Sequence, residues 1–167
     1  MTVPETFPGE GQLGWFYWRA LANFPDKAAV IDISQAEPRH IRFRDLDAAM
    51  NRVANLLTDA GLGPGDRIGL GMSNRYEFLA AMFGAMRAGA VPVPMNVKQN
   101  VDVLAYILAD SGAKAAIVEP AANPRLLDAA ADVGLKFAFG DAPAGWTPFW
   151  PAVEAAAATF EPLALKP

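Results

Sequence analysis

Met86-Arg-Ala-Gly-Ala-Val-Pro-Val-Pro-Met-Asn96 joins the end of one helix to a short strand that carries two prolines. The helix before it has apolar residues at helical spacing and ends at Gly89. Ala90–Val93 then has the apolar character of a buried strand. Because proline cannot donate a hydrogen bond to a sheet ladder, Pro92 and Pro94 predict that this strand lies at a sheet edge or at a strand end.

The segments before this stretch alternate helix and strand. Arg44–Ala60 has apolar residues at the i, i+3, i+4, i+7 spacing of an amphipathic helix, and Gly61 supplies its stop. Arg67–Leu70 is a short β-rich run. Asn74 is placed to cap the next helix, with Glu77 three residues on as its capping-box partner.

The same alternation extends to both ends of the chain. Helices are predicted over Gln12–Phe24, Asn100–Asp110, Asn123–Val133 and Pro151–Ala158, and strands over Ala28–Ile33, Arg39–Phe43, Lys114–Val118 and Leu135–Phe139. The two early strands are separated by a turn, which indicates a hairpin or neighbouring strands. Strands that alternate with helices at this spacing predict an α/β fold, a largely parallel sheet with helices on both faces.

The composition limits the classes of function. The net charge is −4 and lysine or arginine forms no basic stripe, so we expect no nucleic-acid partner. The absence of cysteine excludes disulfides, cysteine zinc ligands and a thiol nucleophile. The sequence has no signal-peptide pattern and no apolar run of about 18 residues, so we expect a cytoplasmic domain without a transmembrane segment. A hydrophobic share of 53% indicates either a deep core or a face that other protein covers.

Two glycine-containing segments invite comparison with phosphate-binding loops. Gly61-Leu-Gly-Pro-Gly65 follows a helix and precedes a strand, the reverse of the context that such loops need, so we expect a helix stop and a tight turn. Gly69-Leu-Gly71-Met-Ser-Asn74 has the right context for a dinucleotide fingerprint. However, Asn74 replaces the third glycine, and no acidic residue follows the next strand to hold a ribose. An oxidoreductase domain that binds NAD(P) or flavin therefore stays a lesser alternative.

A few polar residues are candidates for catalysis or binding. His40 is the only histidine and has no candidate nucleophile near it in the sequence, so it is expected at the surface or at a strand edge. No histidine pair or carboxylate cluster has metal-ligand spacing, and no metal ligand is assigned. Lys98 lies just beyond a strand end and before a helix start, where ligands gather in open α/β sheets. It is therefore either a ligand contact or an ordinary solvated lysine.

Taken in order, several segments resemble adenylate-forming (AMP-binding) acyl-CoA synthetases, in particular long-chain fatty acid and aryl-CoA ligases. Arg42-Phe-Arg-Asp-Leu46 stands at the family's Thr/Ser-Tyr-x-Glu-Leu helix start, and Met86–Pro94 at its Leu-Lys-Ala-Gly-x-x-x-Val-Pro strand entry. Phe24-Pro-Asp-Lys-Ala-Ala-Val30 and Leu104-Ala-Tyr-Ile-Leu-Ala-Asp-Ser-Gly-Ala-Lys114 match the family's opening and its following helix. Arg42 replaces the usual hydroxyl residue, so the ordinary side-chain cap of that helix is lost.

The resemblance implies an activity, cofactors and partners for the parent enzyme. Such enzymes activate a carboxylic acid with ATP and Mg²⁺ to an acyl-adenylate, release pyrophosphate, and pass the acyl group to CoA or to a carrier-protein thiol. Asn96-Val-Lys98 stands where many relatives have Asn-Pro-Arg. For Lys98 this implies a contact with the nucleotide end of CoA.

The segments that perform the family's chemistry have no counterpart in this sequence. Its phosphate loop, Tyr-Thr-Ser-Gly-Thr-Thr-Gly-x-Pro-Lys-Gly, has no match here. We therefore expect residues 1–160 to form the N-terminal subdomain, and residues 161–167 an extended tail toward that loop, with the remainder of the parent chain as partner. No catalytic residue is assigned, and no cofactor is expected to bind these residues tightly. The alternative is a free-standing binding module that retains only the scaffold.

Overall fold

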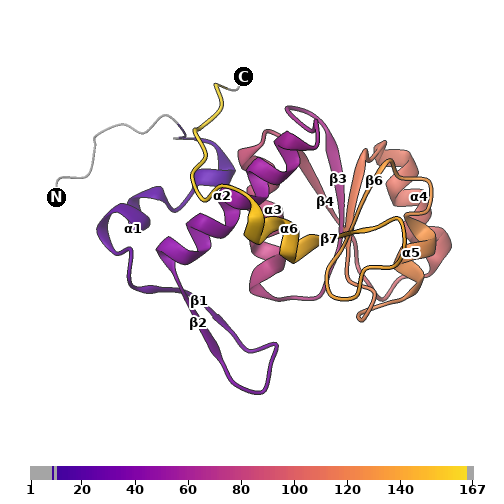
Figure 1. The fold of residues 1–167 in the computed structure, drawn as a ribbon, viewed down its shortest axis with the longest axis horizontal. Helices are drawn as coiled ribbons and strands as arrows, with labels where there is room; N and C mark the ends of the chain where they lie inside the picture. Colours follow the sequence, from indigo (N-terminus) through magenta and orange to yellow (C-terminus); the bar gives the residue numbers. More distant parts are fainter. Residues whose placement is uncertain (1–8, 10, 165–167) are drawn as a thin grey trace.

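The computed structural model describes residue 9 and residues 11–164. Within them, a five-stranded sheet has the order β4-β3-β5-β6-β7, and a separate two-stranded sheet pairs β1 with β2 (Figure 1). Every pairing in the larger sheet is parallel, whereas β1 and β2 are antiparallel. The strands are β1 (Ala28–Asp32), β2 (Arg39–Arg42), β3 (Arg67–Gly71), β4 (Val91–Pro94), β5 (Ala115–Val118), β6 (Leu135–Ala138) and β7 (Thr147–Pro148). The predicted α/β class and the early hairpin are confirmed.

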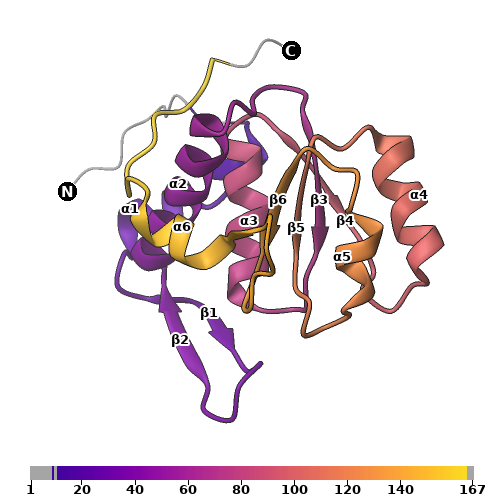
Figure 2. The same ribbon diagram turned by 45° about the vertical axis from the view of Figure 1, so that its right-hand side comes forward.

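Helices cover both faces of the parallel sheet. α2, α3 and α6 lie on one face, and α4 and α5 lie on the other, whereas the β1–β2 hairpin projects away from the layers (Figure 2). The helical elements are η1 (Leu13–Trp15), α1 (Trp18–Asn23), α2 (Phe43–Asp59), α3 (Tyr76–Arg87), α4 (Val101–Ser111), α5 (Arg125–Ala129) and α6 (Phe149–Ala155). The sheet is thus buried on both sides, which explains the continuous apolar run of its central strands.

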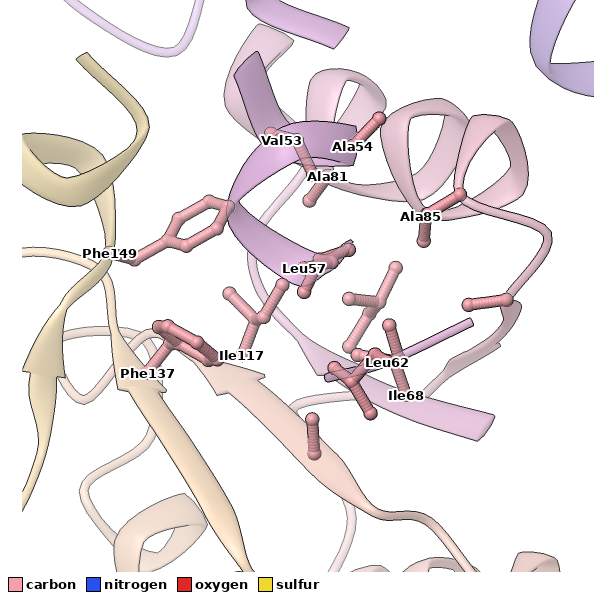
Figure 3. Packing of buried hydrophobic residues seen from close by; sticks show 14 of the residues in the cluster. Val53, Ala54, Leu57, Leu62, Ile68, Ala81, Ala85, Ile117, Phe137 and Phe149 are labelled. Atoms are coloured by element: carbon pink, nitrogen blue, oxygen red, sulfur yellow. The ribbon is translucent and has the colours of Figure 1, made fainter. Parts of the chain in front are cut away.

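The hydrophobic core follows from the alternation of side chains along β5. Ala115 and Ile117 belong to the cluster beneath α2, α3 and α6, which Figure 3 shows around Ile117 and Phe149. Ala116 and Val118 belong to the cluster beneath α4 and α5. All four side chains are fully buried. Because each strand residue points to the face opposite its neighbour, one short strand serves two cores.

The position of β4 matches the prediction made from its prolines. β4 is an edge strand that pairs only with β3 among the described strands. The N–H groups of Val91 and Met95 donate to carbonyls of the β3 segment, at 2.7 and 2.8 Å. Pro92 and Pro94 alternate with these donors, so the positions without an N–H face the open edge of the sheet.

Three elements differ from the sequence-based expectations. The helix predicted over Gln12–Phe24 is broken into η1 and α1, because Tyr17 between them has a non-helical backbone with ψ of 15°. The helix predicted over Asn123–Val133 is reduced to α5, since turns at its end return the chain to β6. The structure also adds the short strand β7, for which the sequence predicts no element.

The segment after α6 runs along α2, held by side chains that donate to its backbone. Asn55 Nδ2 donates to the carbonyls of Ala157 and Thr159, both at 2.8 Å, and Asn51 Nδ2 donates to that of Ala158 at 2.9 Å. Residues 161–164 form no helix or strand, and the rest of the tail expected over residues 161–167 lies outside the described residues.

Candidate functional site

A cleft of about 460 Å³ opens where β3 and β4 end. One wall is the turn between β3 and α3, and the other is the loop between β4 and α4. Most of its surface is apolar, with three uncharged polar side chains and one cation. The residues that line it are Met72, Ser73, Asn74, Phe78, Pro94, Met95, Asn96, Val97 and Lys98. It lies at the carboxyl ends of parallel strands, where ligands bind in open α/β sheets.

Lys98 is the one charged residue among the described residues that line this cleft. Its backbone N–H donates to Asn96 Oδ1 at 3.0 Å, an Asx turn that shapes the β4–α4 loop. Lys98 is exposed. Within the described part of the chain, no hydrogen bond or ion pair engages its ammonium group. The geometry therefore leaves this cation available for an anionic group in the cleft.

The opposite wall is anchored by a chain of alternating charges. Glu119 follows β5, and its Oε1 pairs with Arg75 at 2.7 Å. Arg75 also pairs with Glu77 at 3.0 Å, and Glu77 pairs with Arg39 of β2 at the same distance. Arg39 in turn pairs with Asp32 of β1 at 2.5 Å. The network thus connects the hairpin to the carboxyl edge of the parallel sheet.

Most of this network is buried, so each charge depends on its partners. Asp32, Glu77 and Glu119 are all buried residues. Burial by itself raises the pKa of Asp32, but hydrogen bonds from Ser34, from the Tyr76 N–H and from Arg39 hold that pKa well below its usual range. The pKa of Arg39 is raised, chiefly by its hydrogen bonds to Glu77. Asp32 and Arg39 are therefore both charged at neutral pH.

The start of α3 differs from the capping box predicted for Asn74 and Glu77, which is wrong. The helix begins at Tyr76, and its N-cap residue Arg75 makes no side-chain cap. Asp32 from the hairpin accepts the Tyr76 N–H at 3.1 Å instead. Glu77 does not serve as a cap because its carboxylate binds Arg39 and Arg75 instead. A tertiary carboxylate has replaced the local cap, which sequence spacing does not reveal.

The glycines of the possible dinucleotide fingerprint serve helix packing. Gly69 and Gly71 both lie within β3, not in a turn after it. A Cβ at Gly69 would approach Leu108 of α4 to 2.3 Å, and one at Gly71 would approach Leu126 of α5 to 2.7 Å. These glycines let two helices pack closely on the sheet. They form no loop that would cradle a pyrophosphate, which removes the basis of the oxidoreductase alternative.

The other residues considered have structural roles. His40 lies exposed on β2 opposite Ile31, as expected. Gly61 and Gly65 have φ of 83° and 82° in the turn after α2, which confirms the helix stop. The described residues contain no group of three or more His, Cys, Asp or Glu side chains that could hold a metal ion. No described helix is long and apolar enough to cross a membrane.

Sequence reasoning missed Arg75 and Glu119, which support one wall of the cleft without lining it, and the buried Arg87 away from it. Glu119 directly follows the strand β5, so the carboxyl-edge rule that selected Lys98 also applied to it. Arg87 was seen only as part of a family motif, because nothing in its local sequence predicts a buried cation. The predicted loss of the side-chain cap at Arg42 is confirmed, because Arg42 is the N-cap of α2 and its side chain makes no capping hydrogen bond.

The described residues therefore define an α/β scaffold with a small cleft at its carboxyl edge, lined in part by the exposed Lys98. Comparison with known proteins agrees with this class. Residues 17–159 match the model of the AMP-binding enzyme family. Because this match spans most of the chain, the chain belongs to the AMP-binding enzyme family.

Individual relatives make the same connection. A long-chain-fatty-acid–CoA ligase of Mycobacterium tuberculosis, FadD13, is 33% identical over 105 residues, which are 63% of this chain and 20% of the relative. The structure of a benzoate CoA ligase from Burkholderia xenovorans superposes with a TM-score of 0.78 at 25% identity, covering 92% of this chain and 30% of that one. The N-terminal domain of FACL13 from Mycobacterium tuberculosis superposes with a TM-score of 0.73 at 28% sequence identity. The superposition covers 93% of this chain and 38% of that one. The chain thus spans about a fifth of the curated relative's length.

Proposed function

We propose that this chain is the N-terminal scaffold of an acid–thiol ligase. The proposed reaction converts ATP, a carboxylic acid and CoA to acyl-CoA, AMP and pyrophosphate through an acyl-adenylate. The observation that carries the proposal is the family match over residues 17–159, together with a similarity to CoA ligases that extends over 92% of the chain in one solved structure. The relatives' names include a fatty-acid ligase and a benzoate ligase, so the proposal specifies a carboxylic acid and no chain length.

Lys98 is proposed to contact the phosphates at the nucleotide end of CoA. Two features support this role: the ammonium group has no partner among the described residues, and the cleft beside it has apolar walls that suit a base. An exposed lysine acts as a point charge, so its contribution is small and is screened by salt. CoA would supply the thiol that accepts the acyl group, and these residues would only help to bind it.

The effect of Lys98 can be measured by titrating the isotopically labelled chain with CoA and following amide signals of the cleft. We expect Lys98→Ala to weaken binding by roughly threefold, the size typical of one exposed ion pair, and the difference to shrink at high salt. Lys114→Ala is the matched control, because its ammonium pairs with Asp66 away from the cleft. Equal binding by the wild type and Lys98→Ala would remove Lys98 from the proposal.

We further propose that these 167 residues do not catalyse on their own. The sequence has no Gly/Ser/Thr-rich phosphate loop with lysine, and the described residues offer no metal-holding carboxylate cluster. Contacts to the triphosphate and to Mg²⁺ would then come from elsewhere in the enzyme. The test is exchange of labelled pyrophosphate into ATP by the purified chain, with a panel of fatty and aromatic acids. Acid-dependent exchange above background would contradict the claim.

The remainder of the parent chain is proposed as the partner of the exposed apolar side chains. Ile31 and Ile33 on the hairpin are 56% and 77% exposed, and Leu13 and Phe16 near α1 are 67% and 60% exposed. Such residues gathered on projecting elements favour burial against further protein. We place the proposed ligase in the cytoplasm, where ATP and CoA are supplied.

The alternative function is a binding module that keeps the scaffold and performs no chemistry. The feature that favours it is the pair of hydrophobic clusters, which fill both faces of the sheet from within the described residues. The two functions differ in the size and activity of the native protein. A ligase requires a polypeptide several times longer that exchanges pyrophosphate into ATP when an acid is present. The binding module requires neither the greater length nor the exchange activity.

A further inference from the structure

We propose that Glu119 and Asn123 are positioning residues that together brace the two walls of the Lys98 cleft. This inference rests on the proposed function of the cleft as a phosphate-binding site. Both residues belong to the loop between β5 and α5, and neither lines the cleft itself. Each reaches across to a different wall, so one loop fixes the distance between the two.

Glu119 holds the β3–α3 wall. Its Oε2 accepts the backbone N–H of Ser73 at 2.7 Å, and its Oε1 accepts from Arg75 at 2.7 Å. Ser73 lines the cleft and lies 46 residues away in the sequence. Both carboxylate oxygens are thereby occupied in a buried position, and hydrogen bonds to a charged acceptor are among the strong ones. Glu119 therefore acts as a fixed anchor and not as a base or ligand.

Asn123 holds the β4–α4 wall. Its Nδ2 donates to the Val97 carbonyl at 2.8 Å, across 26 residues of sequence. Its Oδ1 accepts the N–H of Arg125 at 3.0 Å, which orients the amide so that Nδ2 points toward the cleft loop. Val97 directly precedes Lys98, so this hydrogen bond fixes the backbone from which the Lys98 side chain extends.

The two anchors are rigidly connected. The N–H groups of Ala122 and Asn123 donate to the Glu119 carbonyl at 3.0 and 3.4 Å, which closes the loop into a tight turn. The Glu119 N–H donates to the Gly71 carbonyl at 2.8 Å and thereby continues the β3–β5 ladder. The turn is thus an extension of the sheet. Opening the cleft would require breaking either side-chain anchor or this turn.

Amide hydrogen exchange on the unliganded chain tests the brace separately from any ligand. We expect Glu119→Ala to speed exchange at Ser73 about tenfold, since a charge-assisted bond is lost, and to leave Lys98 and Gln99 unchanged. Glu119→Gln, which keeps an acceptor, should lie between Glu119→Ala and the wild type. Asn123→Asp should instead speed exchange at Lys98 and Gln99 only, because it removes the donor to Val97. Asn55→Asp is the matched control: it removes the same kind of donor from the segment after α6 and should affect neither wall.

The second readout is binding of adenosine 3′,5′-bisphosphate, followed by amide signals of the cleft. We expect Glu119→Gln and Asn123→Asp each to weaken binding severalfold, while Asn55→Asp binds as the wild type does. Unchanged exchange at Ser73 in Glu119→Ala, or a uniform rise at all amides in every variant, would overturn the brace. If the exchange results agree with the brace but the wild type binds no bisphosphate, the proposed phosphate-binding role of the cleft fails and the brace stands.

Discussion

Arg87 is a buried cation that ties three helical elements together. Its side chain is 1% exposed and lies with its guanidinium 3.8 Å from the centre of the Trp15 ring. The guanidinium donates to the Gly14 carbonyl at 2.8 Å and pairs with Asp47 of α2 at 2.8 Å. It also donates to Asn51, which in turn holds the segment after α6. A single arginine of α3 thus links η1 and α2 to its own helix.

Replacing this cation should be costly. Arg87→Met keeps much of the side-chain volume but leaves Asp47 and several acceptors without their donor, so we expect a loss of about 3 kcal/mol in the free energy of unfolding. Urea unfolding followed by circular dichroism measures it. Arg44→Ala is the control, because the ion pair of Arg44 with Asp26 is exposed on both sides and should contribute less than ~1 kcal/mol. Similar losses in the two variants would show that Arg87 is no special anchor.

Asp32 should make stability depend on acid pH. Its pKa is lowered in the folded chain, despite burial, by hydrogen bonds from Ser34, Tyr76 and Arg39. A carboxyl whose folded pKa lies below its unfolded value stabilises the fold fully above the unfolded value, about 3.9, and loses that stabilisation as pH falls through the folded pKa. The free energy of unfolding should therefore fall between about pH 5 and pH 2, and it should fall less steeply in Asp32→Asn. The exposed Asp141→Asn is the control, and parallel pH profiles for Asp32→Asn and the wild type would contradict the expectation.

Among the elements, α2 and α3 approach each other closely at Gly84. A Cβ there would lie 2.5 Å from the Val53 Cβ and 2.8 Å from the Met50 carbonyl oxygen. Neither atom can be moved by a change of rotamer, so Gly84→Ala requires the helices to separate. We expect the overpacking to outweigh the better helix propensity of alanine and to destabilise the fold by about 2 kcal/mol.

The matched control for this close approach is Gly63→Ala. No atom lies within 4 Å of a Cβ built at Gly63, and its φ is not positive, so we expect a change within about 0.5 kcal/mol. Thermal unfolding of both variants provides the comparison. A Gly84→Ala variant as stable as the wild type would mean that α2 and α3 are less tightly packed than described.

Most elements could be predicted from the sequence because their signals are local. Periodicity located α2 and α4 within one or two residues, and the prolines of β4 identified an edge strand. The failures came from distant partners: Asp32 caps α3 from another sheet, and Tyr17 interrupts the first helix. At the cleft, the place of Lys98 after a strand predicted a position at the carboxyl edge of the sheet, and its role as a ligand contact stays a prediction. Glu119 also follows a strand, but its contact with Ser73 spans 46 residues, and that of Asn123 with Val97 spans 26, so local patterns do not predict either contact.

At the scale of the whole molecule, the described residues form a scaffold with a cleft at the carboxyl edge of its parallel sheet. The match to the AMP-binding enzyme family covers residues 17–159, whereas the aligned part of a curated relative is 20% of its length. The parallel sheet and its helices give the cleft a rigid base, and the charge network fixes the hairpin to the same edge. We propose that these residues work as one part of a larger ligase.

The most direct test is to isolate the native protein from its source cells with an antibody against these residues. Its mass and its acid-dependent exchange of pyrophosphate into ATP are then measured. We expect a polypeptide several times heavier than 17.8 kDa that exchanges pyrophosphate when a carboxylic acid is present. A native species of 17.8 kDa that shows no exchange would contradict the ligase assignment and leave the binding module as the function.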